Sequence, residues 1–209
     1  SFIDLADIIQ ISENSFRKHQ VIFDGKFSNN ITSENTVSKV LRLLDKKKHL
    51  KGKKYLIKIT KNIPQKSGMG GGSMNAAGIL NFFFKQKIIS FNQVRNFAKK
   101  IGSDVILGLN NKTKILFSDN SLKELNKNFF FHCVLVKPKF GCSTNKVFLK
   151  NKIFTKKQYF KNKELSVTKQ HILKGKNDLE HSAFKMYPKL YDLKNRLLSF
   201  KIGEFIRMT

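Results

Sequence analysis

Residues 57–80 read IKITKNIPQKSGMGGGSMNAAGIL, and this stretch decides the fold. It begins as a short alternating strand, passes a proline into a loop with glycines at positions 68, 70, 71 and 72, and continues as a helix-forming run. Glycine tolerates the positive φ angles that turn successive backbone N–H groups into one concavity. A helix that starts directly after the loop adds the positive end of its dipole. The stretch therefore predicts a phosphate-binding loop between a strand and a helix.

Two common phosphate-binding motifs do not fit this loop. A P-loop carries its lysine after the glycines, whereas Lys66 precedes them here. A dinucleotide fingerprint that began at Gly68 would need a third glycine at the position of Ser73. A flexible glycine linker is the remaining alternative. Linkers are rarely framed by a strand and an Ala-Ala helix start, so the sequence favours a phosphate-binding loop of another kind.

Residues 64–77, Pro-x-x-x-Gly-Met-Gly-Gly-Gly-Ser-x-Asn-Ala-Ala, resemble the second motif of the GHMP kinases (galactose, homoserine, mevalonate and phosphomevalonate kinases). The triple glycine with Asn before Ala-Ala resembles one branch, the kinases of 4-diphosphocytidyl-2-C-methyl-D-erythritol in non-mevalonate isoprenoid biosynthesis. Residues 35–37, 101–105 and 177–180 resemble further segments of that branch, in the same order. Four segments in order make this resemblance specific.

Both ends of the chain depart from the pattern of the family it resembles. Members begin with a Lys-x-Asn-Leu motif and an Asp-Gly-Tyr-His segment, and neither is present. The third motif of the family, Gly-Ser-Gly after Arg-Met-Ser/Thr, is also missing, because the sequence stops at Arg207-Met208-Thr209. The resemblance therefore leads us to expect an internal fragment of a longer enzyme, inactive and poorly stable by itself.

The resemblance implies an α+β fold of two domains. Residues 1–128 are expected to form the ATP-binding domain, with a mixed sheet and helices on one side, and residues 129–209 a smaller domain of ferredoxin-like character. The implied reaction transfers the γ-phosphoryl group of ATP, with Mg²⁺, to the 2-hydroxyl of 4-diphosphocytidyl-2-C-methyl-D-erythritol. Another small-molecule GHMP kinase is the alternative within the fold, and a non-catalytic basic RNA-binding protein is the alternative from a different class.

The resemblance also implies an ATP site on the glycine loop. The expected nucleotide contacts are Pro64, Gln65, Lys66, Ser67, Gly68, Met69, Gly70, Gly71, Gly72, Ser73 and Met74. Ser73 is in addition a candidate Mg²⁺ ligand, although Met74 stands where the family usually has a second serine, and no other metal ligand is assigned. Lys61 and Lys66 flank the loop; phosphate contact and coincidence among many lysines both remain open.

Asp104 matches the catalytic carboxylate of the family and is expected to contact the substrate hydroxyl. A carboxylate there can accept the proton of a hydroxyl, although spacing alone leaves a capping role for Asp104 open. Ile106 stands where the family usually has proline. Thr144 and Phe148 resemble a segment that lines the substrate pocket, where an aromatic ring stacks on cytosine; a core phenylalanine is the alternative. Residues 177–180 could supply a metal cluster, but a helix start with solvent-facing acids is favoured.

The net charge of +27 comes from 36 lysines and only 5 arginines. Nucleic-acid recognition depends on the arginine fork, and the scattered lysines accompany abundant Asn, Ile and Phe, so AT-rich codon usage explains the excess. We therefore expect no nucleic-acid partner, and the resemblance implies a small-molecule substrate with a cytidine diphosphate group. We also expect no membrane span, because no apolar run reaches ~20 residues.

Cys133 and Cys142 are too few for a disulfide framework, which favours a reducing cytoplasm. The oligomeric state is left open.

Periodicity and punctuation predict the elements. Strands are expected at 2–10, 20–24, 55–60, 113–117 and 129–136, and helices at 35–45, 73–85, 91–100, 145–150 and 177–199. Ser33 is expected to cap the first helix, residues 122–128 to form a polar turn, and Cys133 to lie buried in the last strand. Residues 151–176 are expected to be an insertion or a helix pair.

Overall fold

The computed structural model describes residues 3–117, 119, 121–155, 167–201 and 203–208. Its contacts divide the chain into two compact units. The first unit comprises residues 1–65 and 69–130, and the second comprises residues 66–68 and 131–209. A division by contacts does not identify domains, so the expected ATP-binding domain (1–128) and C-terminal domain (129–209) stay predictions.

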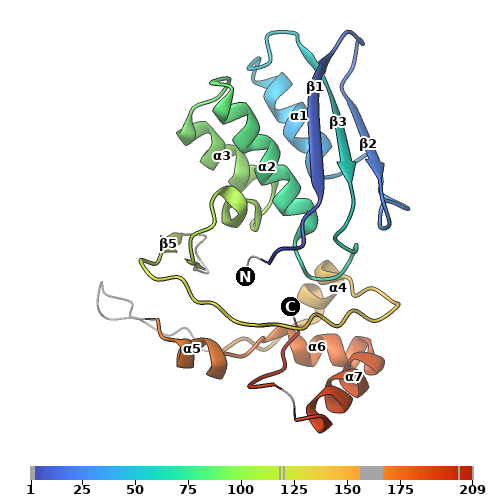
Figure 1. The fold of residues 1–209 in the computed structure, drawn as a ribbon, viewed down its shortest axis with the longest axis vertical. Coiled ribbons are helices and arrows are strands. Elements are labelled where there is room, and N and C mark those ends of the chain that lie inside the picture. The colour runs from blue at the N-terminus through green and yellow to red at the C-terminus, as the bar shows by residue number, and fades with distance from the viewer. Residues whose placement is uncertain (1–2, 118, 120, 156–166, 202, 209) are drawn as a thin grey trace. The chain divides into compact units, whose positions relative to one another are not determined.

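A three-stranded sheet forms one layer of the first unit (Figure 1). Its strands are β1 (Ile8–Asn14), β2 (Gln20–Asp24) and β3 (Lys54–Thr60), in the order β1-β3-β2. The central strand β3 runs antiparallel to β1, with Ile59 opposite Ile9, and parallel to β2, with Ile59 opposite Phe23. The sheet is therefore mixed, as the sequence predicts.

Helices pack on the inward side chains of β3. These helices are α1 (Thr36–Lys46), α2 (Gly71–Lys85), α3 (Phe91–Ile101) and the 3₁₀ turn η1 (Val105–Leu109). Tyr55, Ile57 and Ile59 point from β3 into the core, where Phe83 of α2 is fully buried. Helix α1 presents Val37, Val40, Leu41 and Leu44 to the same core, and this helical spacing is the reason its position was predictable.

Two boundaries in the first unit differ from the sequence prediction. Asn35, and not Ser33, caps α1, because its side chain accepts the N–H groups of Val37 and Ser38 at 3.0 Å each. Ser33 lies two residues too early to reach those amides. Strand β1 begins at Ile8, and residues 3–7, which were expected to belong to it, are not in a strand. Residue 2 lies outside the described residues. The Asp7 carboxylate instead accepts the backbone N–H groups of Asn62 and Ile63.

A small hairpin follows η1, made of β4 (Lys114–Leu116) and β5 (Leu122–Glu124). The two strands pair antiparallel, with Ile115 opposite Lys123. The polar turn expected at 122–128 is therefore wrong at its beginning. The alternation of Leu122, Lys123 and Glu124 is too short to reveal a strand without its partner.

The described part of the second unit contains four helices and no strand. The helices are α4 (Thr144–Lys150), α5 (Lys169–Lys174), α6 (Leu179–Met186) and α7 (Pro188–Ser199). Pro188 occupies the first position of α7, where its missing N–H costs no helical hydrogen bond. Residues 167–176 contain one helix of the expected pair, and residues 156–166 lie outside the described residues.

The strand expected at 129–136 is wrong. No described strand pairs with this run, and Phe130 and Val134 are 88% and 84% exposed. A strand is stabilised by its ladder partners, and an apolar run without a partner stays unpaired. Cys133, expected to be buried in this strand, is exposed. The sheet of the expected ferredoxin-like domain is thus not formed by the residues that the structure describes.

Candidate active site

The glycine loop connects the end of β3 to the start of α2. Gly68 and Gly70 adopt φ angles of +75° and +66°, which side chains disfavour, and this reverses the chain before the helix. Gly70 stands at the N-cap of α2, and its carbonyl accepts the first helical hydrogen bond, from the N–H of Met74 at 2.9 Å. Helix α2 therefore begins two residues earlier than the sequence prediction of residue 73.

The N-terminus of α2 has no side-chain cap and no acidic residue in its first turn. The two other long helices of the first unit are capped differently, because Asn35 and Ser90 each form a capping box. The first amides of a helix have no intrahelical acceptor, and at α2 they are preceded by a glycine run. This arrangement fits an anion at the loop.

Gly71 and Gly72 pack closely against neighbouring segments of the chain. A Cβ atom at Gly71 would stand 3.1 Å from Cγ2 of Ile63 and 3.4 Å from Nζ of Lys61. The hydroxyl of Thr36, the first residue of α1, donates a 2.7 Å hydrogen bond to the Gly72 carbonyl. Side chains at these two positions would crowd Ile63 and Thr36, so packing favours glycine at Gly71 and Gly72, whereas the positive φ angle favours it at Gly68 and Gly70.

Lys61 is buried on the protein side of the loop, next to Gly71. Its side chain is 6% exposed and forms an ion pair with Asp7, whose side chain is fully buried. Burial alone would raise the pKa of Asp7, but hydrogen bonds from Lys61, the Ile63 N–H and Asn75 outweigh it and hold the pKa below its ordinary value. The described geometry therefore gives Lys61 a structural partner, the Asp7 carboxylate.

Asp104 is exposed and stands at the beginning of η1. Its side chain makes no capping hydrogen bond to that turn, so the capping interpretation is wrong. The hydroxyl of Ser103 donates to its carboxylate at 3.4 Å. The carboxylate is thus available to a ligand, which is what a proton acceptor for a hydroxyl requires.

The turn that follows Asp104 docks on the helix that follows the glycine loop. A Cβ atom at Gly108 would lie 2.8 Å from both Ala77 and Met74, and Asn81 donates to the Leu109 carbonyl at 3.1 Å. Ile106, in place of the family's proline, is 4% exposed in the core and anchors the same turn. Asp104 and the glycine loop are therefore supported by one helix, α2.

The second unit carries the expected substrate residues on α4. Ser143 caps this helix, and Val147 is buried at 2% exposure. Thr144 is exposed and Phe148 is 51% exposed, so the interpretation of Phe148 as a core residue is wrong. Within this unit the Cys142 N–H donates to the carbonyl of Lys66 at 3.4 Å, next to the start of α4. The described geometry leaves the faces of Thr144 and Phe148 free for a ligand.

The acids near residue 178 accept hydrogen bonds from other protein groups. Asp178 accepts hydrogen bonds from the N–H and hydroxyl of Thr155, and Glu180 accepts from Lys194 at 2.6 Å and from the Met208 N–H at 2.7 Å. The sequence favoured solvent-facing acids here, but the Glu180 side chain is only 16% exposed, so this prediction is wrong for Glu180. The described residues contain no cluster of three or more His, Cys, Asp or Glu that could hold a metal.

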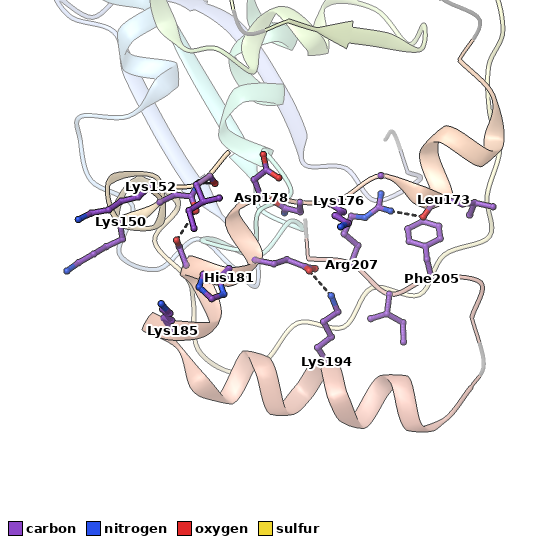
Figure 2. A pocket seen from close by; sticks show the side chains of 17 residues that line it. Lys150, Lys152, Leu173, Lys176, Asp178, His181, Lys185, Lys194, Phe205 and Arg207 are labelled. Atoms are coloured by element: carbon purple, nitrogen blue, oxygen red, sulfur yellow. Dashed lines mark hydrogen bonds and ion pairs between the residues drawn. The ribbon is translucent and has the colours of Figure 1, made fainter. Parts of the chain in front are cut away.

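A pocket of about 710 Å³ opens beside these acids (Figure 2). Arg207 lines it and donates to the carbonyls of Ile172 and Leu173 at 3.0 and 3.1 Å, at the end of α5. Lys194 reaches into the same pocket from α7 to pair with Glu180. These polar groups hold the helices of the second unit to one another.

No described helix is both long and apolar enough to cross a membrane.

Comparisons with known proteins identify the class of kinase. The model of the GHMP kinases N terminal domain matches residues 35–112, which include the glycine loop and Asp104. A 4-diphosphocytidyl-2-C-methyl-D-erythritol kinase of Pelagibacter ubique is 43% identical over 211 residues, covering 100% of this chain and 75% of the relative. A kinase of the same name from Anaplasma phagocytophilum is 37% identical over 94 residues, covering 44% of this chain and 32% of that protein. The chain belongs to the 4-diphosphocytidyl-2-C-methyl-D-erythritol kinase family.

A solved structure confirms the fold. The crystal structure of a 4-(cytidine 5'-diphospho)-2C-methyl-D-erythritol kinase superposes with a TM-score of 0.66 at 20% identity, covering 96% of this chain and 72% of that one. The α+β GHMP-kinase fold and the family predicted from the sequence are therefore confirmed. The roles of individual site residues stay predictions.

Several residues that support the loop have no role predicted from the sequence. Asp7, Thr36 and Asn75 contact the loop or its lysine, yet none was assigned a role. Asn75 lies within the family motif at residues 64–77, and Asp7 interrupts an apolar run, but neither signal indicates a contact between them. Since Asp7 and Lys61 lie 54 positions apart in the chain, no local pattern could have paired them.

Proposed function

We propose that the protein carrying this chain transfers the γ-phosphoryl group of ATP to the 2-hydroxyl of 4-diphosphocytidyl-2-C-methyl-D-erythritol. The observation that carries this proposal is the uncapped, glycine-bounded start of α2 together with the exposed Asp104 on a turn docked against α2. One part supplies N–H donors for phosphate and the other supplies a carboxylate for the acceptor hydroxyl. Family membership gives the substrate class.

The chain's contribution to the reaction is positioning and charge stabilisation. The amides of residues 68–74 would hold the phosphates, while Asp104 would orient the acceptor hydroxyl and take its proton. Phe148 would stack on the cytosine ring, and Thr144 would donate a hydrogen bond beside it. Each of these roles needs an exposed group, and Asp104, Thr144 and Phe148 are exposed.

Magnesium fits the oxygen chemistry of the loop. Mg²⁺ prefers oxygen ligands and is usually bound by one or two protein groups together with substrate phosphates. The Ser73 hydroxyl, in the first turn of α2, is the chain's own candidate ligand. When bound with ATP, the ion would neutralise negative charge that develops on the phosphates. A reducing cytoplasm remains the proposed compartment, because both cysteines are free.

A matched pair of glycine substitutions tests the nucleotide site. Gly71→Val places methyl groups against Ile63, whereas Gly78→Val lies on the exposed side of the same helix, where a Cβ meets only Ile9 at 3.5 Å. In the complete protein that carries this sequence, we expect Gly71→Val to abolish ATP binding measured by calorimetry and Gly78→Val to retain it. Unchanged ATP affinity in Gly71→Val would overturn the assignment of the loop.

A substrate panel tests the reaction itself. The complete protein is incubated with ATP, Mg²⁺ and either 4-diphosphocytidyl-2-C-methyl-D-erythritol, mevalonate, homoserine or galactose, and the product is followed by ³¹P NMR. We expect a new phosphomonoester signal with the cytidine-containing substrate only. Turnover of another alcohol in its place would favour the alternative of a different small-molecule GHMP kinase.

A further inference from the structure

A buried polar cluster formed by Asp7, Lys61 and Asn75 lies at the base of the glycine loop. One carboxylate oxygen of Asp7 accepts the N–H groups of Asn62 and Ile63, each at 2.8 Å. The other accepts the Asn75 side-chain amide at 2.9 Å and the Lys61 ammonium. The Asp7 carboxylate therefore receives four donors.

These donors come from the two ends of the glycine loop. Asn62 and Ile63 follow β3 and open the loop, while Asn75 lies in the second turn of α2, just after the loop closes. Asp7 belongs to a third segment, directly before β1. A single carboxylate thus fixes both ends of the loop to the first strand of the sheet.

The cluster also lies next to the loop backbone, through the ammonium group of Lys61. The Lys61 ammonium lies 3.4 Å from the position that a Cβ of Gly71 would take. The loop backbone therefore rests directly on the buried ion pair.

Stability alone does not account for such a cluster. Burying an ion pair carries a desolvation penalty that often equals its attraction, and apolar side chains of similar volume frequently serve stability as well. What a saturated carboxylate supplies is geometry, since four donors fix its position and that of the segments they belong to. Preorganised donors are what a phosphate site needs, because ordering a loop upon binding lowers affinity.

We propose that Asp7, Lys61 and Asn75 are positioning residues that hold the glycine loop and the first turns of α2 in their nucleotide-binding arrangement before the nucleotide binds. This inference rests on the proposed function. It assigns to the three residues no contact with substrate, and it predicts that their loss weakens ATP binding more than it changes the affinity for the acceptor alcohol.

The test compares the ion pairs at the two ends of β3. Asp7→Asn keeps the size of the side chain and removes the charge from the loop end. Asp45→Asn does the same at the far end, where Asp45 pairs with Lys54 at 2.8 Å and both side chains are about a quarter to a third exposed. In the complete protein we expect Asp7→Asn to raise the Kd for ATP roughly 10- to 100-fold, the scale of a small displacement in a binding site. Asp45→Asn should leave that Kd within about twofold.

Two further readouts separate positioning from general loss of structure. Amide hydrogen exchange in residues 66–75 of the ligand-free protein should accelerate in Asp7→Asn and not in Asp45→Asn, while KM for the acceptor stays near its original value. Where Asp7→Asn does not fold, Asn75→Ala removes one of the four donors and should raise the Kd for ATP several-fold. An ATP Kd that is unchanged in a folded Asp7→Asn or Asn75→Ala variant would overturn the inference. Absence of ATP binding in the unsubstituted protein would instead overturn the proposed function.

Discussion

The two units of the chain bury apolar side chains to different extents. In the first unit, α1, α2, α3, η1 and β3 share one core in which Leu44, Ile57 and Phe83 are fully buried. In the second unit, the buried apolar side chains among the described residues are Val147 and Ala183, while Leu149 and Ile153 are 78% and 74% exposed. The helices of the second unit are joined by polar contacts, such as the 2.8 Å hydrogen bond between Ser182 and Asn151.

This difference bears on how each unit can serve a reaction. The phosphate loop and Asp104 are attached to α2, whose inner face is embedded in the large core. Thr144 and Phe148 are carried by α4, which buries one side chain. A rigid support favours the step that tolerates the least displacement, which in phosphoryl transfer is the alignment of phosphate and acceptor. Four predictions test this contrast, beginning with the largest effect.

The first prediction compares the cores directly. Phe83 is fully buried and packs edge-to-face on Tyr55, with ring centroids 5.0 Å apart. Phe83→Ala should lower the free energy of unfolding of the first unit by about 3–5 kcal/mol. Leu149→Ala, in the second unit, should change stability by less than about 0.5 kcal/mol, because its side chain is already exposed. Hydrogen exchange resolved by segment measures both, and equal effects would contradict the contrast.

The second prediction concerns Asp104. Replacing it by Asn keeps the shape of the side chain but removes the proton acceptor, so kcat should fall by roughly 100-fold or more. ATP affinity should be retained, because the loop amides are untouched. Asp24→Asn, at an exposed carboxylate at the end of β2, is the matched control and should turn over normally. Near-normal turnover in Asp104→Asn would remove this residue from the site.

The sequence predicted the features that depend on neighbouring residues. The periodicity of Val37, Val40 and Leu44 located α1, and the glycine run located both the loop and α2. Asp104 was found through a motif that contains it. These features are local, so a single stretch of chain carries their whole signal.

The strand predicted at 129–136 failed because a strand needs a partner from elsewhere in the chain. Residues 129–136 read as a buried strand, but a strand exists only with a ladder partner, and none of the described strands provides one. The prediction that Cys133 is buried failed for the same reason, because it assumed that strand, and Cys133 is exposed. The ion pair between Asp7 and Lys61 could not be predicted from the sequence either, because the two residues are brought together only by the folded sheet.

The third prediction probes the second unit at Phe148. Base–aromatic stacking is worth ~1–3 kcal/mol upon alanine substitution, so Phe148→Ala should raise KM for the cytidine-containing substrate by roughly tenfold. The KM for ATP should stay unchanged. Phe154→Ala, another half-exposed phenylalanine of this unit, serves as the control. If both alanine variants raised the acceptor KM equally, Phe148 would have no particular role in recognising cytosine.

The last prediction compares two carboxylates under acid. Asp7 in the first unit has a pKa that burial would raise but hydrogen bonds from Lys61, the Ile63 N–H and Asn75 hold low. Asp178 in the second unit has a pKa lowered by hydrogen bonds from the hydroxyl and N–H of Thr155. A lowered pKa in the folded state means that the carboxylate stabilises the fold above the unfolded pKa of ~3.9. That stabilisation is lost as the pH falls from about 4 through the folded pKa.

The two sites should differ in how much each contributes to this acid-induced loss. Asp178 is partly exposed, so solvent partly screens its interactions, whereas the side chain of Asp7 is fully buried. Asp7→Asn should therefore lower the stability of the first unit at neutral pH and reduce the loss of stability as the pH falls below about 4. The stabilities of the variant and the unsubstituted protein should then converge in acid. Asp178→Asn should shift the stability curve of the second unit far less. Hydrogen exchange across this pH range, followed separately in α2 and α6, measures both, and comparable flattening would show that burial does not set the contrast between the two carboxylates.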